Sequence, residues 1–431
     1  MNQAQSELID VSQLKVGMYV ELELGWMAHP FPTSSFKISS DKQINIIRSL
    51  GRQQIRYVPG KSDLHAPATG LAARTNNTAP VTTEALLTSP NPEQLARKQR
   101  SELLSAQQRD LMACERRFGQ TVRQYKQAIE LMHNQPRVAM EQCRELVNGF
   151  VGEMLASGES AIRLLSDGMG DKLAMHPINI TVIALLLGKY MKLPASEMAD
   201  LGMSAFLHDI GKSKVPDRVR WLEDSFSIAE QKAYQEHVAQ GVSLGQRMEL
   251  TPGALQAIAQ HHEMVDGSGF PARIKGDAMS QPAKILALVN RYEDLCNPSR
   301  PAAAITPHEA LALIFAQLKA RFDPLVLGAF IRMMGVYPPG SVVQLGDERY
   351  AMVVSVNSSR PLKPRVIVFD AKVSKHEALI LDLEACPELG IRRSLKPASL
   401  PRAAMDYLSP RQRICYFFER AVNTPQKEDA P

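Results

Sequence analysis

Residues 135–335 constrain the fold most, because this long stretch has a helical pattern throughout and no strand-like alternation. Helix start signals recur along it. Ser227 and Glu230 form a capping-box pattern. Further starts place a proline directly after a capping residue, at Thr251, Thr306 and Asp323. The stretch is therefore predicted to fold as an all-α domain.

The composition of the 431 residues is that of an ordinary globular protein, with 45% hydrophobic and 22% charged residues. A net charge of +5 without basic runs argues against DNA binding and gives weak support for an anionic ligand. Five scattered cysteines with no CxxC pair indicate a reducing compartment. The N-terminus has no apolar leader, and the longest apolar run, "ITVIALLLGKYM", is too short to span a bilayer. The sequence therefore predicts a cytoplasmic protein without a membrane span.

Changes of pattern divide the chain into six predicted segments. The first has strand-like alternation in "VGMYVELEL" and a helix in "SSDKQINIIRSLG". A stretch rich in Ala, Thr, Pro and Asn follows, which can bury little. After "GVYPPG" the runs become short and β-rich. The predicted order is a small α+β domain (1–60), a flexible linker (61–93), an amphipathic helix (94–134), a helical catalytic domain (135–335), a small β domain (336–400) and a polar tail (401–431).

The predicted helix 94–134 has two interpretations. Apolar residues recur every seven positions, at Leu104, Leu111, Phe118, Tyr125 and Met132. Such a row is typical of a homodimer seam, but its companion positions are incomplete. An amphipathic helix lying on its own domain explains the row equally well.

A cluster of metal-ligand residue types lies in the helical domain. It consists of His176, His208, Asp209, His237, His261 and His262. A lone histidine on an apolar helix is usually a core residue, but two abutting doublets are harder to explain by core packing. Adjacent helical residues point about 100° apart, so both members of a doublet enter one site only at a junction between helices. Histidine with carboxylate suits Fe, Mn, Zn or Ni, and the absence of cysteine argues against a structural zinc.

Two features beside the cluster point to a phosphate ligand. Lys212 is four residues after His208, which would bring both side chains to one helix face and place a cation beside the metals. The alternative is that Lys212 is a solvent-exposed lysine without a role in the site. The loop "MVDGSGFPARIKG" follows the second doublet, with Gly267 and Gly269 for a tight turn and Arg273 as a cation for phosphates.

Taken together, these residues resemble the HD-GYP family, bacterial phosphodiesterases that hydrolyse cyclic di-GMP. The resemblance covers about residues 170–335, and rests on "HDIGKSKVP", His237, "HHEMVDGSGFPARIKG", "AKILALVNRYEDL" and "RP" at Arg300. The opening residues, with "VSQLKVGMYVEL" and "IRYVPG", resemble the uncharacterised domain that precedes many such proteins. The implied fold is mainly α, an HD-superfamily helical bundle flanked by a small α+β N-terminal domain and a small β-rich C-terminal domain.

The resemblance also implies residue roles. It implies two divalent transition metals, with Fe or Mn favoured and Ni, Co or Zn as alternatives. The implied metal ligands are His176, His208, Asp209, His237, His261, His262 and Asn290, with Asp209 bridging the two metals. Asp209 and Lys212 would act in catalysis. The implied substrate-binding residues are Lys212, Asp266, Gly269, Phe270, Pro271, Arg273 and Arg300. Two cations would supply a water nucleophile at neutral pH, and cyclic di-GMP would yield linear pGpG or GMP.

The sequence departs from the family pattern at four positions. Ala303 replaces the lysine of the family's RPxxK pattern, which removes a contact to substrate phosphate. Phe270 replaces the tyrosine of G-Y-P, which keeps the ring and loses a hydroxyl. Lys172 replaces an acid that often precedes the first histidine by one turn, so at most two metals are expected. Asn290 replaces a metal-binding aspartate, and its neutral oxygen weakens one metal position.

These departures leave more than one function open. The retained ligands favour an active cyclic di-GMP phosphodiesterase in bacterial signalling. The alternative is a catalytically weak or inactive HD-GYP protein that acts as a cyclic di-GMP receptor or interaction module, which Asn290, Ala303 and Phe270 favour. A phosphohydrolase of another nucleotide is a third candidate, against which "DGSGFP" argues. Signalling proteins are expected to dock on the N-terminal or β domain.

Overall fold

The structure is a computed structural model of the chain, and it describes residues 6–22, 35–49, 54–62, 92–156, 160–166, 172–221, 225–357, 360–386 and 388–420. Most of the predicted linker and the last residues of the predicted tail lie outside these ranges. The chain divides into two compact units, Met1–Leu87 and Thr88–Pro431. Among the described helices, none is both long and apolar enough to cross a bilayer.

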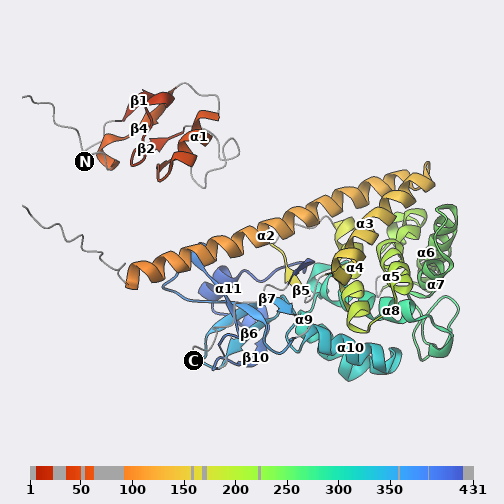
Figure 1. Cartoon of the computed structure of the whole chain (residues 1–431). Coiled ribbons are helices and arrows are strands. Elements are labelled where there is room, and N and C mark those ends of the chain that lie inside the picture. The colour runs from red at the N-terminus through yellow and green to blue at the C-terminus, as the bar shows by residue number, and fades with distance from the viewer. Residues whose placement is uncertain are drawn as a thin grey trace, which may run out of the picture. The chain divides into compact units, whose positions relative to one another are not determined.

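The N-terminal unit is a small α+β fold, as the sequence predicts. Four antiparallel strands form its sheet in the order β1-β4-β2-β3, with one helix beside them (Figure 1). Its core consists of aliphatic side chains such as Val20, Ile47 and Ile55. The elements are β1 (Glu7–Asp10), β2 (Tyr19–Glu21), β3 (Ser35–Lys37), α1 (Asp41–Ser49) and β4 (Gln54–Tyr57).

The second unit is mainly helical, which confirms the predicted fold class (Figure 1). Its caps form as the sequence predicts: Ser227 and Glu230 close a capping box, and Thr306 closes another with Glu309. The longer helices are α2 (Pro92–Leu131), α3 (Pro136–Ala156), α4 (Lys172–Tyr190), α5 (Ala195–Leu207), α6 (Ile228–Arg247), α7 (Pro252–Gln260), α8 (Gln281–Cys296), α9 (Pro307–Leu313) and α10 (Pro324–Met334).

Helix α2 lies on its own domain along its C-terminal half. Phe118 and Tyr125 are buried there, and their rings meet Phe417 and Phe206 edge to face. Nearer its start, the Gln107 side chain both donates to and accepts from the backbone of Ile380. The apolar row of α2 thus has partners within the chain, while a homodimer stays a prediction.

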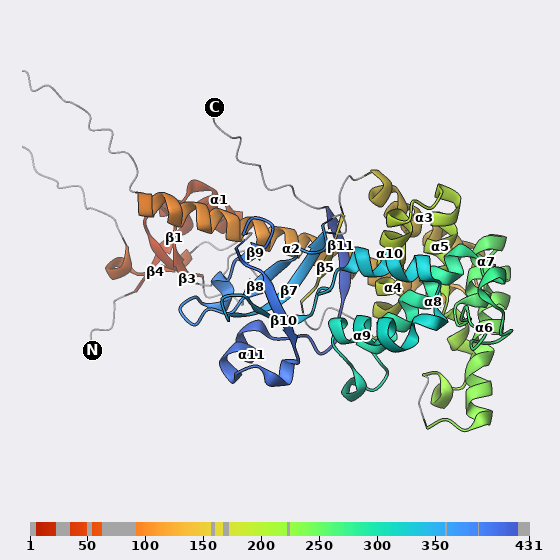
Figure 2. The same cartoon turned by 90° about the horizontal axis from the view of Figure 1, so that it is seen from below.

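A seven-stranded sheet packs beside the helices, and it corrects two predictions (Figure 2). The expectation of no strand within residues 135–335 is wrong, because residues 160–164 form an interior strand of the sheet. The predicted polar tail is wrong for residues 402–420, which form a helix and a buried strand. The elements are β5 (Ser160–Leu164), β6 (Val342–Leu345), β7 (Tyr350–Asn357), β8 (Arg365–Val368), β9 (Ile380–Asp382), β10 (Ile391–Leu395), α11 (Arg402–Leu408) and β11 (Tyr416–Arg420).

The C-terminal sheet is therefore not an independent module. Strand β5 lies between β7 and β11, so the helical stretch supplies an interior strand of the sheet. Every residue of β5 is buried, and a strand covered on both faces shows no alternation in its sequence. The expected β domain at 336–400 is instead part of a larger sheet shared with residues 160–164 and 416–420.

A substitution of Phe417 measures how much β11 contributes to the hydrophobic core between the sheet and the helices. Its ring is fully buried against Phe118 and Phe150, so Phe417→Ala leaves a cavity between the sheet and two helices. We expect the free energy of unfolding to fall by about 3–5 kcal/mol, measured by urea denaturation. Leu325→Ala is the control, because this side chain is 77% exposed and should cost no more than about 0.5 kcal/mol. Equal stability of both variants would contradict the burial of β11.

Candidate metal centre

Three histidines present the same ring nitrogen to the centre of the helical bundle. His208, His237 and His261 each hold Nδ1 against the carbonyl oxygen three residues earlier, at 2.8, 2.6 and 2.6 Å. A carbonyl only accepts, so Nδ1 carries the proton and donates it. In the neutral ring Nε2 then keeps its lone pair, which is the state of a metal-ligating histidine.

The Nε2 atoms lie in two facing pairs. The two Nε2 atoms of His176 and His208 are 3.3 Å apart, as are those of His237 and His261. His176 also has its Nδ1 engaged, at 2.5 Å from Oε2 of Glu293. In the His237–His261 pair both nitrogens are unprotonated, so they cannot form a hydrogen bond with each other. Ligand nitrogens about 2.0–2.1 Å from one ion lie at this kind of separation, so each pair has the geometry of a chelate.

Asp209 lies between the two pairs. Its Oδ2 is 3.4 Å from Nε2 of both His176 and His208. Its Oδ1 is 3.7 Å from Nε2 of His237 and 3.9 Å from that of His261. Oδ1 is buried and has no hydrogen-bond partner among the described residues. Each carboxylate oxygen therefore faces one histidine pair, and the residues fit two cations bridged by Asp209.

His262 and Asn290 complete the cluster on one side. A His262 ring nitrogen lies within 4.8 Å of ligand atoms of Asp209, His237 and His261. Asn290 is buried on α8, and its Oδ1 also lacks a partner within the described ranges. An unpartnered amide oxygen is costly to bury, and a cation would satisfy it.

The charges of the cluster depend on burial and on Asp209. Burial lowers the pKa of His237 to about 4 and holds the pKa of His261 well below its usual value, so both rings are neutral at pH 7. Burial would raise the pKa of Asp209, but the Lys212 ammonium and the rings of His208 and His176 together outweigh burial and hold that pKa well below the usual value. Burial would also lower the pKa of His176, but the carboxylates of Glu293 and Asp209 together raise it to about 10.

Lys212 reaches the centre by a route that differs from the predicted one. Helix α5 ends at Leu207, and a 3₁₀ helix (Ile210–Lys214) follows, so Lys212 and His208 do not share an α-helical face. The Lys212 ammonium instead donates to Oδ2 of Asp209 at 2.6 Å. It also lies over the rings of Trp221 and Tyr234, at 5.1 and 5.6 Å from their centroids.

Gly211 allows this 3₁₀ helix to approach α6. A Cβ at Gly211 would lie 1.9 Å from the carbonyl oxygen of His237 and 2.4 Å from the backbone nitrogen of Gly241. Both contacts are with backbone, which cannot move aside as a flexible side chain can. A glycine is therefore required between the two sets of ligands.

The loop after His262 is organised by Glu263. This buried carboxylate accepts from the backbone nitrogens of Ala272, Arg273 and Ile274, at 2.6, 3.0 and 3.2 Å. Gly269 is required here as well, because a Cβ would lie 2.4 Å from the backbone nitrogen of Met264.

Residues of this loop predicted to bind substrate have different positions. Phe270 stacks on the imidazole of His262, with centroids 4.5 Å apart, and Pro271 follows it through a cis peptide bond. Two cavities open at the centre. Gly269 and Phe270 line one of them, whereas Asp266 and Arg273 are exposed and line neither. Asp266 instead accepts from the backbone and hydroxyl of Ser268, so it shapes the turn.

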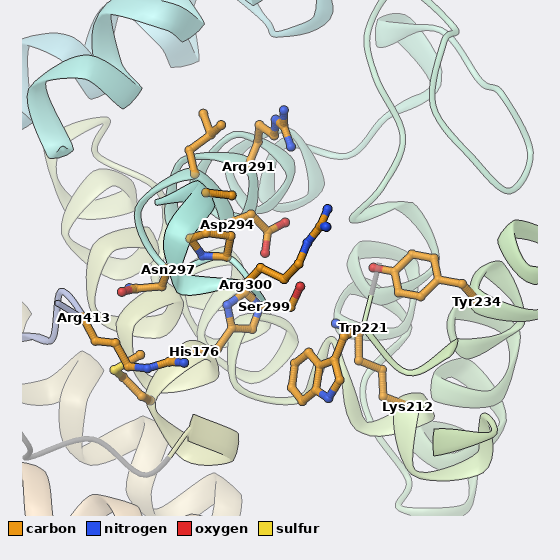
Figure 3. A pocket seen from close by; sticks show the side chains of 14 residues that line it. His176, Lys212, Trp221, Tyr234, Arg291, Asp294, Asn297, Ser299, Arg300 and Arg413 are labelled. Carbon is orange, nitrogen blue, oxygen red and sulfur yellow. The ribbon is translucent and has the colours of Figure 1, made fainter. Parts of the chain in front are cut away.

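Two neighbouring cavities open at the centre. One of about 270 Å³ is lined by His176, Lys212 and Arg300, together with Trp221 (Figure 3). The other, of about 230 Å³, lies beside Phe270 and the second histidine pair. Both cavities are lined in part by Tyr234, Arg291 and Asp294, so they adjoin.

The sequence reasoning missed several residues of the site. Glu293 is fully buried and positions His176, while its Oε1 accepts from the side-chain amides of Asn179 and Asn297 at 2.9 and 2.7 Å. The helical spacing of Glu293 and Asp294 from Asn290 is the signal that could have found them. The cavity arginines Arg291, Arg321 and Arg413 were missed as well. The side chain of Lys172 lies outside the described residues.

Two family models match the sequence. One, described as HD domain, matches residues 128–326, and the other, described as a domain of unknown function (DUF3391), matches residues 6–143. The chain contains an HD domain. This confirms the predicted helical bundle and the predicted N-terminal domain type.

Named relatives share parts of the sequence to different extents. A cyclic di-GMP phosphodiesterase of Pseudomonas aeruginosa is 26% identical over 380 residues, which are 85% of this chain and 86% of that protein. A cyclic di-GMP phosphodiesterase response regulator of Xanthomonas campestris pv. campestris is 32% identical, over 35% of this chain and 40% of that protein. A 3'3'-cGAMP-specific phosphodiesterase of Vibrio cholerae is 25% identical, over 42% and 39%. The HD-domain chain thus spans less than half of the latter two proteins.

Gly211→Ala tests the contact that brings the ligands together. The new methyl group must displace the backbone of α6 at His237, so we expect a loss of about 1–3 kcal/mol in unfolding free energy. Metal content after dialysis should fall too, because His237 moves relative to Asp209. Gly149→Ala is the matched control: it also lies in a helical segment, and a Cβ there meets nothing within 4 Å. Unchanged stability and metal content in Gly211→Ala would contradict the close approach.

Proposed function

We propose that the chain is a metal-dependent phosphodiesterase that hydrolyses cyclic di-GMP. The observation that carries the proposal is the Asp209 carboxylate between two pairs of histidine Nε2 atoms. The relatives named as cyclic di-GMP phosphodiesterases support the choice of substrate. Two bound cations would lower the pKa of a water molecule and stabilise negative charge on a phosphate.

The chain's own residues would prepare this reaction in three ways. His208, Asp209 and their partners hold the ligand atoms in place before the substrate arrives, which avoids reorganisation during the reaction. Lys212 donates to Asp209 and also lines the 270 Å³ cavity, so its ammonium can offset charge developing on a phosphate oxygen. Arg300 lines the same cavity and is placed to hold the dinucleotide. The bond broken is the ester bond to one ribose, which yields linear pGpG, and a second cleavage yields GMP.

We also propose the finer assignments that the sequence suggests. The two metals would be Fe or Mn, because imidazole and carboxylate ligands without thiolates suit these ions. The protein would act in the cytoplasm, which agrees with five free cysteines, Cys114, Cys143, Cys296, Cys386 and Cys415.

A second candidate function is a cyclic di-GMP receptor with little or no turnover. Asn290 favours it, because the amide oxygen supplies no negative charge to a metal position. A site with weak metal occupancy would keep the cationic cavity that binds the dinucleotide and lose the nucleophile.

The deciding experiment supplies Mn or Fe during purification, measures bound metal, and follows cyclic di-GMP by chromatography. We expect hydrolysis to fall by more than about a hundredfold in His208→Ala and in Asp209→Ala, because each removes a metal ligand. 3'3'-cGAMP serves as the competing substrate. Tight binding of intact cyclic di-GMP without hydrolysis would favour the receptor, and preferred cleavage of 3'3'-cGAMP would reassign the substrate.

Asn290→Asp tests whether this position limits metal binding. A carboxylate there adds negative charge beside the histidines, so metal content and turnover should both rise, each by about tenfold where occupancy is limiting. Asn148→Asp, on an exposed position of α3, is the matched control for the charge change. Unchanged metal content and turnover in Asn290→Asp would show that Asn290 does not limit metal binding.

A further inference from the structure

Arg413 is a cation in the cavity that comes from outside the helical bundle. It lies in the short segment between α11 and β11, about 200 residues after Asp209, and lines the 270 Å³ cavity with His176 and Lys212 (Figure 3). Its side chain is half-buried. It makes no hydrogen bond or ion pair with any residue that the structure describes.

The backbone beside Arg413 is held firmly in place. The carbonyl of Ile414 accepts from Nδ2 of both Asn179 and Asn297, at 2.9 and 2.8 Å. The nitrogen of Ile414 donates to Oδ1 of Asn297 at 2.8 Å, and the nitrogen of Tyr416 donates to Oδ1 of Asn179 at 2.8 Å. Such a clamp fixes the position from which the Arg413 side chain enters the cavity.

The same clamp is joined to the metal centre. Asn179 and Asn297 also donate to Oε1 of Glu293, and Oε2 of Glu293 accepts a hydrogen bond from Nδ1 of His176. Each amide thus uses both of its hydrogens, one on the C-terminal segment and one on Glu293. The position of Arg413 is therefore set relative to the metal ligand His176.

The side chains that line this cavity carry more positive than negative charge. Its lining includes four cationic side chains, Lys212, Arg291, Arg300 and Arg413, and one carboxylate, Asp294. Lys212 is paired with Asp209, and among the described residues no ion pair joins that carboxylate to Arg413. A half-buried guanidinium without a partner suits a phosphate group, because its planar N–H donors can form two parallel hydrogen bonds to two phosphate oxygens.

We propose that Arg413 binds the phosphate of the cyclic dinucleotide that does not lie at the metal centre. This inference rests on the proposed function and adds a specificity residue to it. A cyclic dinucleotide has two phosphodiesters, so one can occupy the metal centre while the other contacts Arg413. The C-terminal segment then favours substrates with two phosphates over substrates with one.

The test compares a substrate with two phosphodiesters and one with a single phosphodiester. The full-length, Mn-loaded protein and its Arg413→Gln variant are assayed with cyclic di-GMP and with bis(4-nitrophenyl) phosphate. We expect KM for cyclic di-GMP to rise about tenfold in Arg413→Gln, because a charged hydrogen bond is lost. The value of kcat/KM for bis(4-nitrophenyl) phosphate, the metal content and the melting temperature should stay unchanged. Arg413→Lys should recover part of the loss.

Arg402→Gln is the matched control, because Arg402 lies on α11 of the same C-terminal region and lines neither cavity of the centre. Unchanged KM for cyclic di-GMP in Arg413→Gln overturns the inference, and so does an equal loss with both substrates, which indicates a structural role. If the wild type binds cyclic di-GMP without hydrolysis, the dissociation constants are compared instead. A tenfold weaker binding supports the inference, and equal binding overturns it. A wild type that cleaves bis(4-nitrophenyl) phosphate but neither binds nor cleaves cyclic di-GMP overturns the proposed function first, and the inference with it.

Discussion

The organisation of the HD domain depends on one carboxylate, that of Asp209, between two pairs of imidazole nitrogens. Without a cation, the Nε2 lone pairs of His237 and His261 face each other at 3.3 Å, and Oδ1 of Asp209 is buried without a partner among the described residues. Such an arrangement opposes folding, because buried polar atoms that lose water and gain no partner are costly. A cation in each pair reverses the sign of this contribution. The stability of the bundle and its affinity for metal are therefore linked.

Several unrelated elements hold the ligands against that repulsion. Backbone carbonyls fix three of the rings, and the Glu293 carboxylate fixes His176. Gly211 lets the 3₁₀ helix that carries Lys212 touch α6 at His237. These contacts are made by backbone or by fully buried side chains, which move little. The centre is consequently preorganised, which is where most of the electrostatic advantage of such a site originates.

The sequence identified the residues that the fold brings into one cluster, but it identified their surroundings poorly, for physical reasons. His208-Asp209 and His261-His262 could be found because abutting polar residues are rare in a core, and the helices because caps and periodicity are local signals. Strand β5 was missed since its five residues are buried on both sides and show no alternation. Strand β11 pairs with β5 across about 250 residues, and no local pattern encodes such a pairing. Glu293 had a local signal in its helical spacing from Asn290, but its hydrogen bond to His176 is a contact made only by the fold.

The missed contacts change how the chain's departures from its family pattern should be weighed. Asn290 removes a negative charge from the metal centre. The adjoining cavity of about 270 Å³ is lined by four cationic side chains. Cations that contact a phosphate away from the reacting bond hold substrate and transition state about equally, so they raise affinity without raising the rate of the chemical step. The metal ligands act on the reacting phosphate and do raise that rate. A chain that has weaker metal ligands and keeps these cations binds the dinucleotide but hydrolyses it more slowly. One fold can therefore serve as a phosphodiesterase, as a receptor, or as an enzyme of intermediate activity. Where this chain lies is then decided by metal occupancy beside Asn290, since the cationic side chains of the cavity are present in either case.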